Sequence, residues 1–263
     1  LMLRRPPRST LSSSSAASDV YKRQFFDIGR YWGGSALDMY VDLAWQNGFG
    51  LRIGQFLLPL GFDYMTDYVR QPLVNNSLLQ SYAKANGGRD IGATGSWQNG
   101  RFSVTTAVIN GAGANADDND ARKDVCARFT AKPFGALDAV VALRGYYGWP
   151  GWSDTAWSSV AAEARFRSGS LELQAEIQNH SGDDGRNNAA YLQAAWGLGL
   201  FEPAARFDLV LPRGRRSEWM LTAGLNLRPI PEHLRVMLDC SYRRNYQDNW
   251  SVLAFMLRVQ AWL

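Results

Sequence analysis

Residues 234–243 read LRVMLDCSYR, and this stretch decides the fold. Its even-numbered positions are apolar: Leu234, Val236, Leu238, Cys240 and Tyr242. Most of its odd-numbered positions are polar: Arg235, Asp239, Ser241 and Arg243. A period of two indicates a β-strand, since successive side chains of a strand point to opposite faces, whereas an amphipathic helix has apolar residues three and four positions apart. Residues 170–179 and 250–263 alternate in the same way.

The same alternation recurs along most of the chain and predicts thirteen strands. They cover roughly 36–45, 49–58, 90–98, 101–109, 123–132, 137–147, 156–167, 170–179, 188–197, 202–211, 218–228, 234–244 and 250–263. Most of them are about ten residues long, which is the length that a tilted strand needs to cross the hydrocarbon layer of a membrane. The sequence therefore predicts an all-β fold, an antiparallel up-and-down transmembrane β-barrel.

The connections between the predicted strands alternate in length. Tight turns such as Gln46-Asn47-Gly48 and Gln98-Asn99-Gly100 are separated by longer polar stretches, of which 59–89 is the longest. Asn-Gly between alternating strands is a strong hairpin signal. Short turns on one side and long loops on the other are typical of outer-membrane barrels.

A soluble β-sandwich is the alternative fold that this alternation leaves open. A run of thirteen hairpin-connected strands without a sandwich crossover would expose long sheet edges to water. Aromatic residues also gather near strand ends, where they are expected at the two membrane interfaces: Trp45, Phe49, Trp97, Phe102, Trp196, Phe201, Trp219, Trp250 and Trp262. Both features favour the barrel.

The excess of basic over acidic residues lies entirely in the first 24 residues. Of the 28 basic and 24 acidic residues, five basic and one acidic lie there, which leaves 23 of each sign for 25–263. This Pro- and Ser-rich stretch has no apolar core for a signal peptide and resembles translated sequencing-adapter read-through. We expect 1–24 to be a non-native, disordered tail, 25–263 to be part of a barrel whose N-terminal strands are missing, and nucleic acid not to be a partner.

Four stretches resemble the family of phosphate-selective porins O and P. They are IGQFLLPLGFDY (53–64), GGRDIGATGSW (87–97), the segment 103–133 with Asn110-Gly111 and Arg128, and TAGLNLRPIPEHLRVMLDCSY (222–242). The resemblance implies a sixteen-stranded, homotrimeric channel in the bacterial outer membrane. If the last strand is the sixteenth, the loop 59–89 joins strands five and six, where the family resemblance implies a loop that folds into the lumen and narrows it.

No catalytic or metal-binding constellation is visible, so we expect neither an enzyme nor a cofactor. His180 and His233 are expected at the surface, Cys126 and Cys240 lack the spacing of a metal site, and the acidic run at 117–120 lacks that of an EF-hand. An enzymatic barrel with a Ser/His or Asp/His pair, or a barrel with a structural role, stays the alternative class.

The charged residues that the alternation points inward carry the functional hypothesis. Ten bases are predicted to line the pore: Arg52, Arg70, Lys84, Arg89, Arg128, Arg144, Arg165, Arg206, Arg235 and Arg258. Arg228 and Arg243 share that face, but so do seven acids: Asp90, Asp124, Glu163, Glu172, Glu176, Asp208 and Asp239. Rings of Arg favour anions, and the planar guanidinium matches phosphate. Passive diffusion of small anions such as phosphate or polyphosphate is therefore predicted, with a general, non-selective porin as the alternative.

Overall fold

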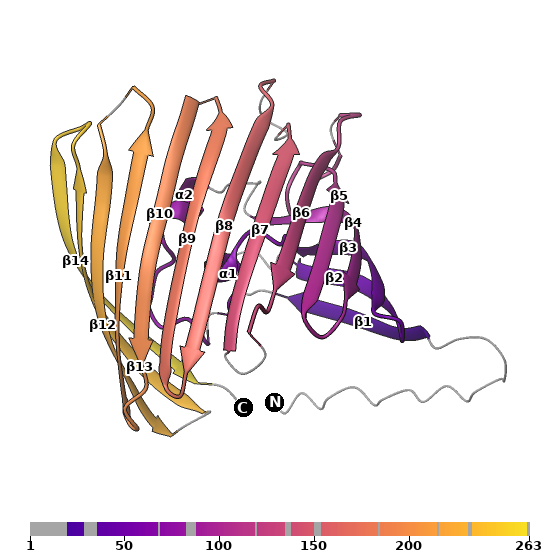
Figure 1. The fold of residues 1–263 in the computed structure, drawn as a ribbon. Coiled ribbons are helices and arrows are strands. Elements are labelled where there is room, and N and C mark those ends of the chain that lie inside the picture. The colour runs from indigo at the N-terminus through magenta and orange to yellow at the C-terminus, as the bar shows by residue number, and fades with distance from the viewer. Residues whose placement is uncertain are drawn as a thin grey trace.

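The computed structural model describes residues 20–28, 36–67, 69–82, 88–118, 120–134, 138–149, 154–183, 185–214, 216–230 and 233–261. Fourteen strands form one sheet in which each strand is hydrogen-bonded to its neighbours in sequence, and every pairing is antiparallel (Figure 1). The expected up-and-down architecture is confirmed. Among the described residues, β1 and β14 are each paired on one side only, so the sheet is not closed.

The strands have the following bounds: β1 Val20–Ile28, β2 Ala36–Trp45, β3 Phe49–Leu57, β4 Arg89–Gln98, β5 Phe102–Ile109, β6 Asp124–Ala131, β7 Asp138–Gly148, β8 Trp157–Ser168, β9 Leu171–Gly182, β10 Gly185–Trp196, β11 Phe201–Pro212, β12 Glu218–Ile230, β13 Leu234–Asn245 and β14 Trp250–Ala261. Two short helices, α1 (Phe62–Met65) and α2 (Leu78–Tyr82), lie between β3 and β4. None of the described helices is long and apolar enough to cross a membrane.

Strand β1 is the one strand that the sequence did not predict. It pairs with β2 from Val20↔Trp45 to Ile28↔Ala36, so the fold includes residues 20–24 of the stretch expected to be a disordered tail. The consecutive polar residues Lys22, Arg23 and Gln24 hide the period of two in this strand. Residues 1–19 lie outside the described residues.

Tight turns close the hairpins at one end of the sheet. At the turn between β2 and β3, Gly48 has a φ of 87°, and the carbonyl oxygen of Gln98 lies where a β-carbon would be placed. Glycine is needed at this position both for its backbone conformation and for the close approach of β4. Aromatic side chains near this end are exposed, among them Phe49, Phe102, Trp196 and Phe201, as expected of an interfacial girdle.

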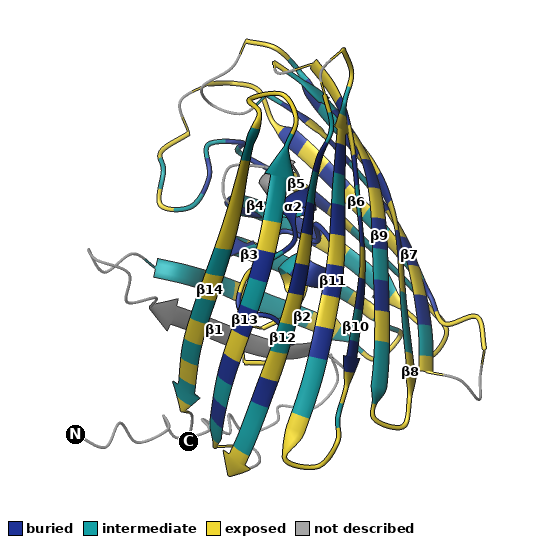
Figure 2. Ribbon diagram, turned by 90° about the vertical axis from the view of Figure 1, so that its left-hand side faces the viewer, coloured by how far each residue is buried: buried dark blue, intermediate teal, exposed yellow. Residues whose placement is uncertain are grey.

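Exposed and buried residues alternate along the strands as stripes (Figure 2). In β9 the Ile177 side chain is 59% exposed, while its neighbours Glu176 and Gln178 are 3% and 1% exposed. Large apolar side chains are exposed along the strands, whereas about half of the buried residues are polar or charged, which a soluble protein would not show. An apolar outer face and a polar inner face are the pattern of a barrel in lipid.

Candidate functional site

The inner wall of the sheet carries a folded segment, residues 58–82, which follows β3. Figure 1 shows its two helices, α1 and α2, within the curve of the sheet. In α2, Leu78 and Leu79 pack against inward-facing apolar residues of β10–β12: Ala189, Tyr191, Val210 and Met220. The segment therefore occupies part of the lumen rather than extending away from the sheet.

Two buried residues of β11 hold the segment at residues 75–78. The Arg206 guanidinium donates hydrogen bonds to the carbonyl oxygens of Asn75 (2.9 Å) and Asn76 (2.8 Å) and to the carboxylate of Asp208 (2.9 Å). The other Asp208 oxygen accepts a hydrogen bond from the backbone N–H of Leu78 at 3.0 Å. Both side chains are at most 1% exposed, so this ion pair is shielded from solvent and its hydrogen bonds hold the backbone of the segment.

Strands β12–β14 hold residues 69–74 in the same manner. Asp239 accepts a hydrogen bond from the Val74 N–H at 2.6 Å, and Arg258 donates one to the carbonyl oxygen of Val74. Asn226 donates to Pro72 at 2.8 Å, and Arg235 donates to Val69 at 3.2 Å. The backbone polar groups of an irregular segment inside the barrel thus find partners on the wall, as burial requires.

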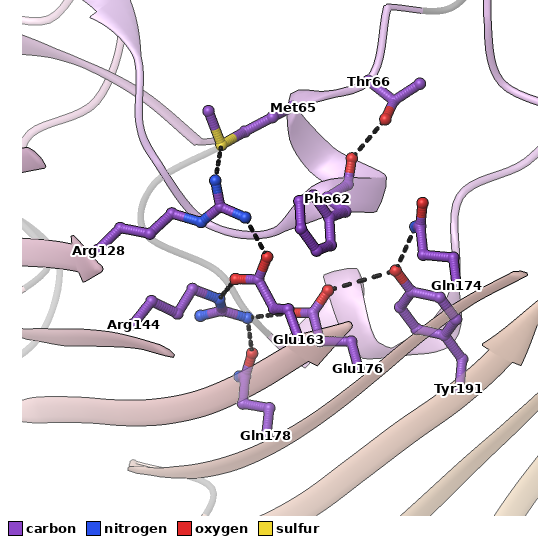
Figure 3. Close-up of polar contacts among 10 residues, drawn as sticks. All are labelled: Phe62, Met65, Thr66, Arg128, Arg144, Glu163, Gln174, Glu176, Gln178 and Tyr191. Carbon is purple, nitrogen blue, oxygen red and sulfur yellow. Dashed lines mark hydrogen bonds and ion pairs between the residues drawn. The ribbon is translucent and has the colours of Figure 1, made fainter. Parts of the chain in front are cut away.

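Helix α1 lies beside two arginines of the wall. The guanidinium carbons of Arg128 (β6) and Arg165 (β8) are each 4.7 Å from the centroid of the Phe62 ring. Arg128 also reaches the sulfur of Met65 and forms an ion pair with Glu163 (Figure 3). Within the described part of the chain, no carboxylate lies within ion-pair distance of Arg165, whose guanidinium therefore keeps its donors available.

A compact ion-pair network lies next to α1 on β7–β9 (Figure 3). Arg144 contacts Glu176 at 2.5 Å, Gln178 at 2.5 Å and Glu163 at 3.3 Å. Arg128 binds the second oxygen of Glu163. The positive charges of two arginines are thus balanced by the negative charges of two glutamates. The sequence placed these side chains on one face, but their pairing depends on the register of four strands.

Gly61, just before α1, shows how closely the segment approaches this network. Its φ is 129°, and a β-carbon built there would lie 2.8 Å from the Glu176 carboxylate. A larger residue at this position would push the segment away from the wall.

Most of the other bases predicted to line the pore are paired with acids or with the segment. Arg52 binds Asp42 at 2.7 Å and Arg89 binds Asp38 at 3.2 Å. Arg235 and Arg228 share Glu202, and Arg243 binds Glu218. Arg70 is exposed and lines a cavity of about 830 Å³ at the turn end of the sheet. Lys84 lies outside the described residues.

Two features of the site were missed or misjudged from the sequence. Phe62 was not singled out, because nothing in an isolated Gly-Phe-Asp-Tyr stretch reports the guanidiniums beside it. His180, expected at the surface, is only 4% exposed in β9, where its ring packs against Trp157 at 4.9 Å between centroids. The strand extends to Gly182, so His180 belongs to the wall rather than to a loop. In the part of the chain that the structure describes, no cluster of His, Cys, Asp and Glu is arranged to hold a metal ion.

An antiparallel sheet with an apolar outer face, a polar inner face and a segment folded against that inner face defines an outer-membrane porin. The model of the family described as phosphate-selective porin O and P matches residues 11–143. The chain belongs to this family and is a channel protein of the bacterial outer membrane. The match begins before β1, in agreement with the inclusion of residues 20–24 in the sheet. No match was found among curated proteins.

Solved porin structures share the fold at low sequence identity. The anion-selective porin from Comamonas acidovorans is 14% identical, with 92% of this chain and 81% of that chain covered and a TM-score of 0.65. The outer membrane channel DcaP of Acinetobacter baumannii is 12% identical, with 93% and 81% covered and a TM-score of 0.63. The trimer form of OmpT from Vibrio cholerae is 11% identical, with 88% and 78% covered and a TM-score of 0.61.

Proposed function

We propose that the protein is a passive, anion-preferring pore, a homotrimer in the membrane, that carries small solutes such as phosphate without altering them chemically. The observation that carries the proposal is the guanidinium of Arg165, which faces inward beside the segment 58–82 and forms no ion pair with an acid among the described residues. The name of the family and the anion selectivity stated for the Comamonas porin support the same preference. The trimer form of OmpT supports the assembly.

The acids of the inner wall do not cancel this preference, because most of them are already engaged. Asp239 and Asp208 accept hydrogen bonds from the backbone of the segment. Asp90 accepts from the N–H groups of Ile91 and Gly113, and Asp124 accepts from Tyr146 and Trp149. These four residues are at most 3% exposed, so a passing cation cannot bind their carboxylates directly. Arg70 and Arg165 keep donors for a solute.

Transport under this proposal needs attraction and release but no energy coupling. An anion enters the water-filled lumen, is drawn to Arg70 at the turn end or to Arg165 near α1, and exchanges part of its hydration shell for guanidinium hydrogen bonds. Several weak sites in succession allow it to leave as well as to enter. The Phe62 ring, lying against Arg128 and Arg165, fixes the positions of the two guanidinium groups.

The reversal potential in a KCl gradient across a planar bilayer tests the proposal. Wild type is expected to prefer chloride, and Arg165→Gln is expected to lower the chloride-to-potassium permeability ratio about two- to fivefold, because an inward positive charge is lost. Arg101→Gln, which removes the same charge from an exposed turn between β4 and β5, serves as the matched control and is expected to change the ratio little. A cation preference in wild type, or equal effects of the two variants, contradicts the proposal. Cross-linking in detergent tests the trimer.

A further inference from the structure

A second cavity lies on the opposite side of the segment from its anchors on β11–β14. It has a volume of about 390 Å³ and lies between residues 56–65 and the inward faces of β2–β6. Pro59 and Met65 line it from the segment, and Phe56 and Leu57 line it from the end of β3. The volume is in the range of small-molecule sites.

Five hydroxyl groups on three neighbouring strands face this cavity: Thr94, Ser96, Ser103, Thr105 and Thr130. The register sets them side by side, since Ser96 pairs with Thr105 across β4 and β5, and Ser103 pairs with Thr130 across β5 and β6. Together they form a hydroxyl shelf, and we use this name for these five residues.

The hydroxyl shelf has no protein partner for its side-chain oxygens in the described part of the chain. Thr94 is the most buried of the five residues, at 8% exposure, and no other described residue forms a hydrogen bond with its hydroxyl. Each hydroxyl can donate one hydrogen bond and accept others, so the shelf suits a molecule in the cavity that both donates and accepts hydrogen bonds. Neighbouring hydroxyls match the hydroxyls of a polyol.

An arginine lies at each end of the shelf. Arg52, opposite Thr94 in the register, uses Nε and Nη2 to bind Asp42, and its Nη1 donates no hydrogen bond within the described residues. Arg128, opposite Thr105, also lines the cavity; it binds Glu163 through Nη2, and its Nη1 reaches only the weak acceptor Met65 Sδ at 3.6 Å. Each guanidinium thus keeps donor capacity toward the cavity, and guanidinium donors suit the oxygens of a phosphate ester.

We propose that this cavity binds a phosphorylated polyol, such as a sugar phosphate, with the phosphate at Arg128 or Arg52 and the sugar hydroxyls on the hydroxyl shelf. The inference rests on the proposed channel function only for the route by which the solute arrives. Inorganic phosphate satisfies the arginines but not the row of hydroxyls, and an uncharged sugar satisfies the hydroxyls but not the arginines. The site therefore discriminates in favour of solutes that carry both groups.

Calorimetric titration of the full chain folded in detergent tests the site, with glucose 6-phosphate, inorganic phosphate and glucose as probes. Glucose 6-phosphate is expected to bind about tenfold more tightly than either other probe, the effect of one to two additional hydrogen bonds. In the double variant Ser96→Ala/Thr105→Val, which removes adjacent hydroxyls, its advantage over inorganic phosphate is expected to fall to about twofold or less. Thr106→Val is the matched control, since Thr106 is exposed on the outer face of the same strand.

Each outcome bears on the inference. Equal affinity for glucose 6-phosphate and inorganic phosphate, no binding of glucose 6-phosphate, or an unchanged advantage in the double variant overturns it. Circular dichroism and the heat-dependent shift on a gel establish that the double variant is folded like the Thr106→Val control. Binding of glucose 6-phosphate by a protein that passes no current supports this site and contradicts the channel function. Anion current in a protein whose binding of glucose 6-phosphate does not depend on the hydroxyl shelf supports the channel function and contradicts this site.

Discussion

Replacing Arg206 by Met is expected to loosen the segment 58–82 from the wall. The variant removes two hydrogen bonds to the carbonyl oxygens of Asn75 and Asn76 and leaves Asp208 buried without its cation. Breaking a buried ion pair from one side costs about 3–5 kcal/mol, which corresponds to roughly two to three and a half orders of magnitude in the ratio of docked to detached segment. The contacts of Leu78 and Leu79 and the anchors at 69–74 remain.

Because part of the anchoring survives, we expect intermittent detachment rather than a permanently open pore. Single-channel recording should show a larger mean conductance and more open-channel noise than wild type, and unfolding in detergent should occur at lower temperature. The double variant Arg206→Met/Asp208→Leu is expected to regain much of the lost stability, since it removes the uncompensated charge. It should keep the noise, because the carbonyl oxygens of residues 75 and 76 still lack donors.

Arg243→Met is the control for this experiment. Arg243 pairs with Glu218 on the neighbouring strand and stacks over Trp250, so it joins wall to wall and contacts no described residue of the segment. Its variant should keep the wild-type conductance and noise. If Arg206→Met behaves like Arg243→Met in both recordings and unfolding, the hydrogen bonds to residues 75 and 76 do not hold the segment, and the reasoning fails.

Two further predictions concern the network beside α1 and the outer face. Glu163→Gln should raise the preference for chloride, because Arg128 and Arg144 lose their shared carboxylate, and should lower the free energy of unfolding by about 3–5 kcal/mol. Reversal potentials and denaturant unfolding measure both, and a fall in chloride preference would contradict the assigned geometry. Ile177→Arg, at a position 59% exposed on the outer face, should destabilise the protein in lipid bilayers by about 2–4 kcal/mol. Equal folding of this variant and wild type in bilayers would mean that this face does not meet lipid.

The strands could be predicted because each face of a membrane-spanning strand meets a different solvent, so the pattern is local. All thirteen predicted strands are present, with ends displaced by a few residues; β9, for example, extends to Gly182. Strand β1 was not predicted, because its middle reads Lys-Arg-Gln and lacks the alternation. Only its pairing with β2 identifies it as a strand.

The site was predictable only as a set of inward-facing side chains. The alternation gave the face on which Arg144 lies, but not that it would contact acids on two further strands, Glu163 and Glu176. Likewise Arg165 is recognisable as inward-facing, whereas the absence of a described carboxylate within ion-pair distance depends on its neighbours in the register and on the position of Phe62. Which charged side chains form ion pairs is therefore decided only when the strands are assembled into the sheet.

The inward-facing residues that α2 covers show which part of the inner wall is shielded from water. Ala189, Tyr191, Val210 and Met220 break the rule that inward-facing residues are polar, and these four lie under α2. In an aqueous pore such residues would face water unless something covered them. Apolar residues at inward positions of a porin sequence therefore map the footprint of the inserted loop. A variant with a shorter loop would therefore also need polar residues in place of the inward-facing apolar residues that the loop had covered.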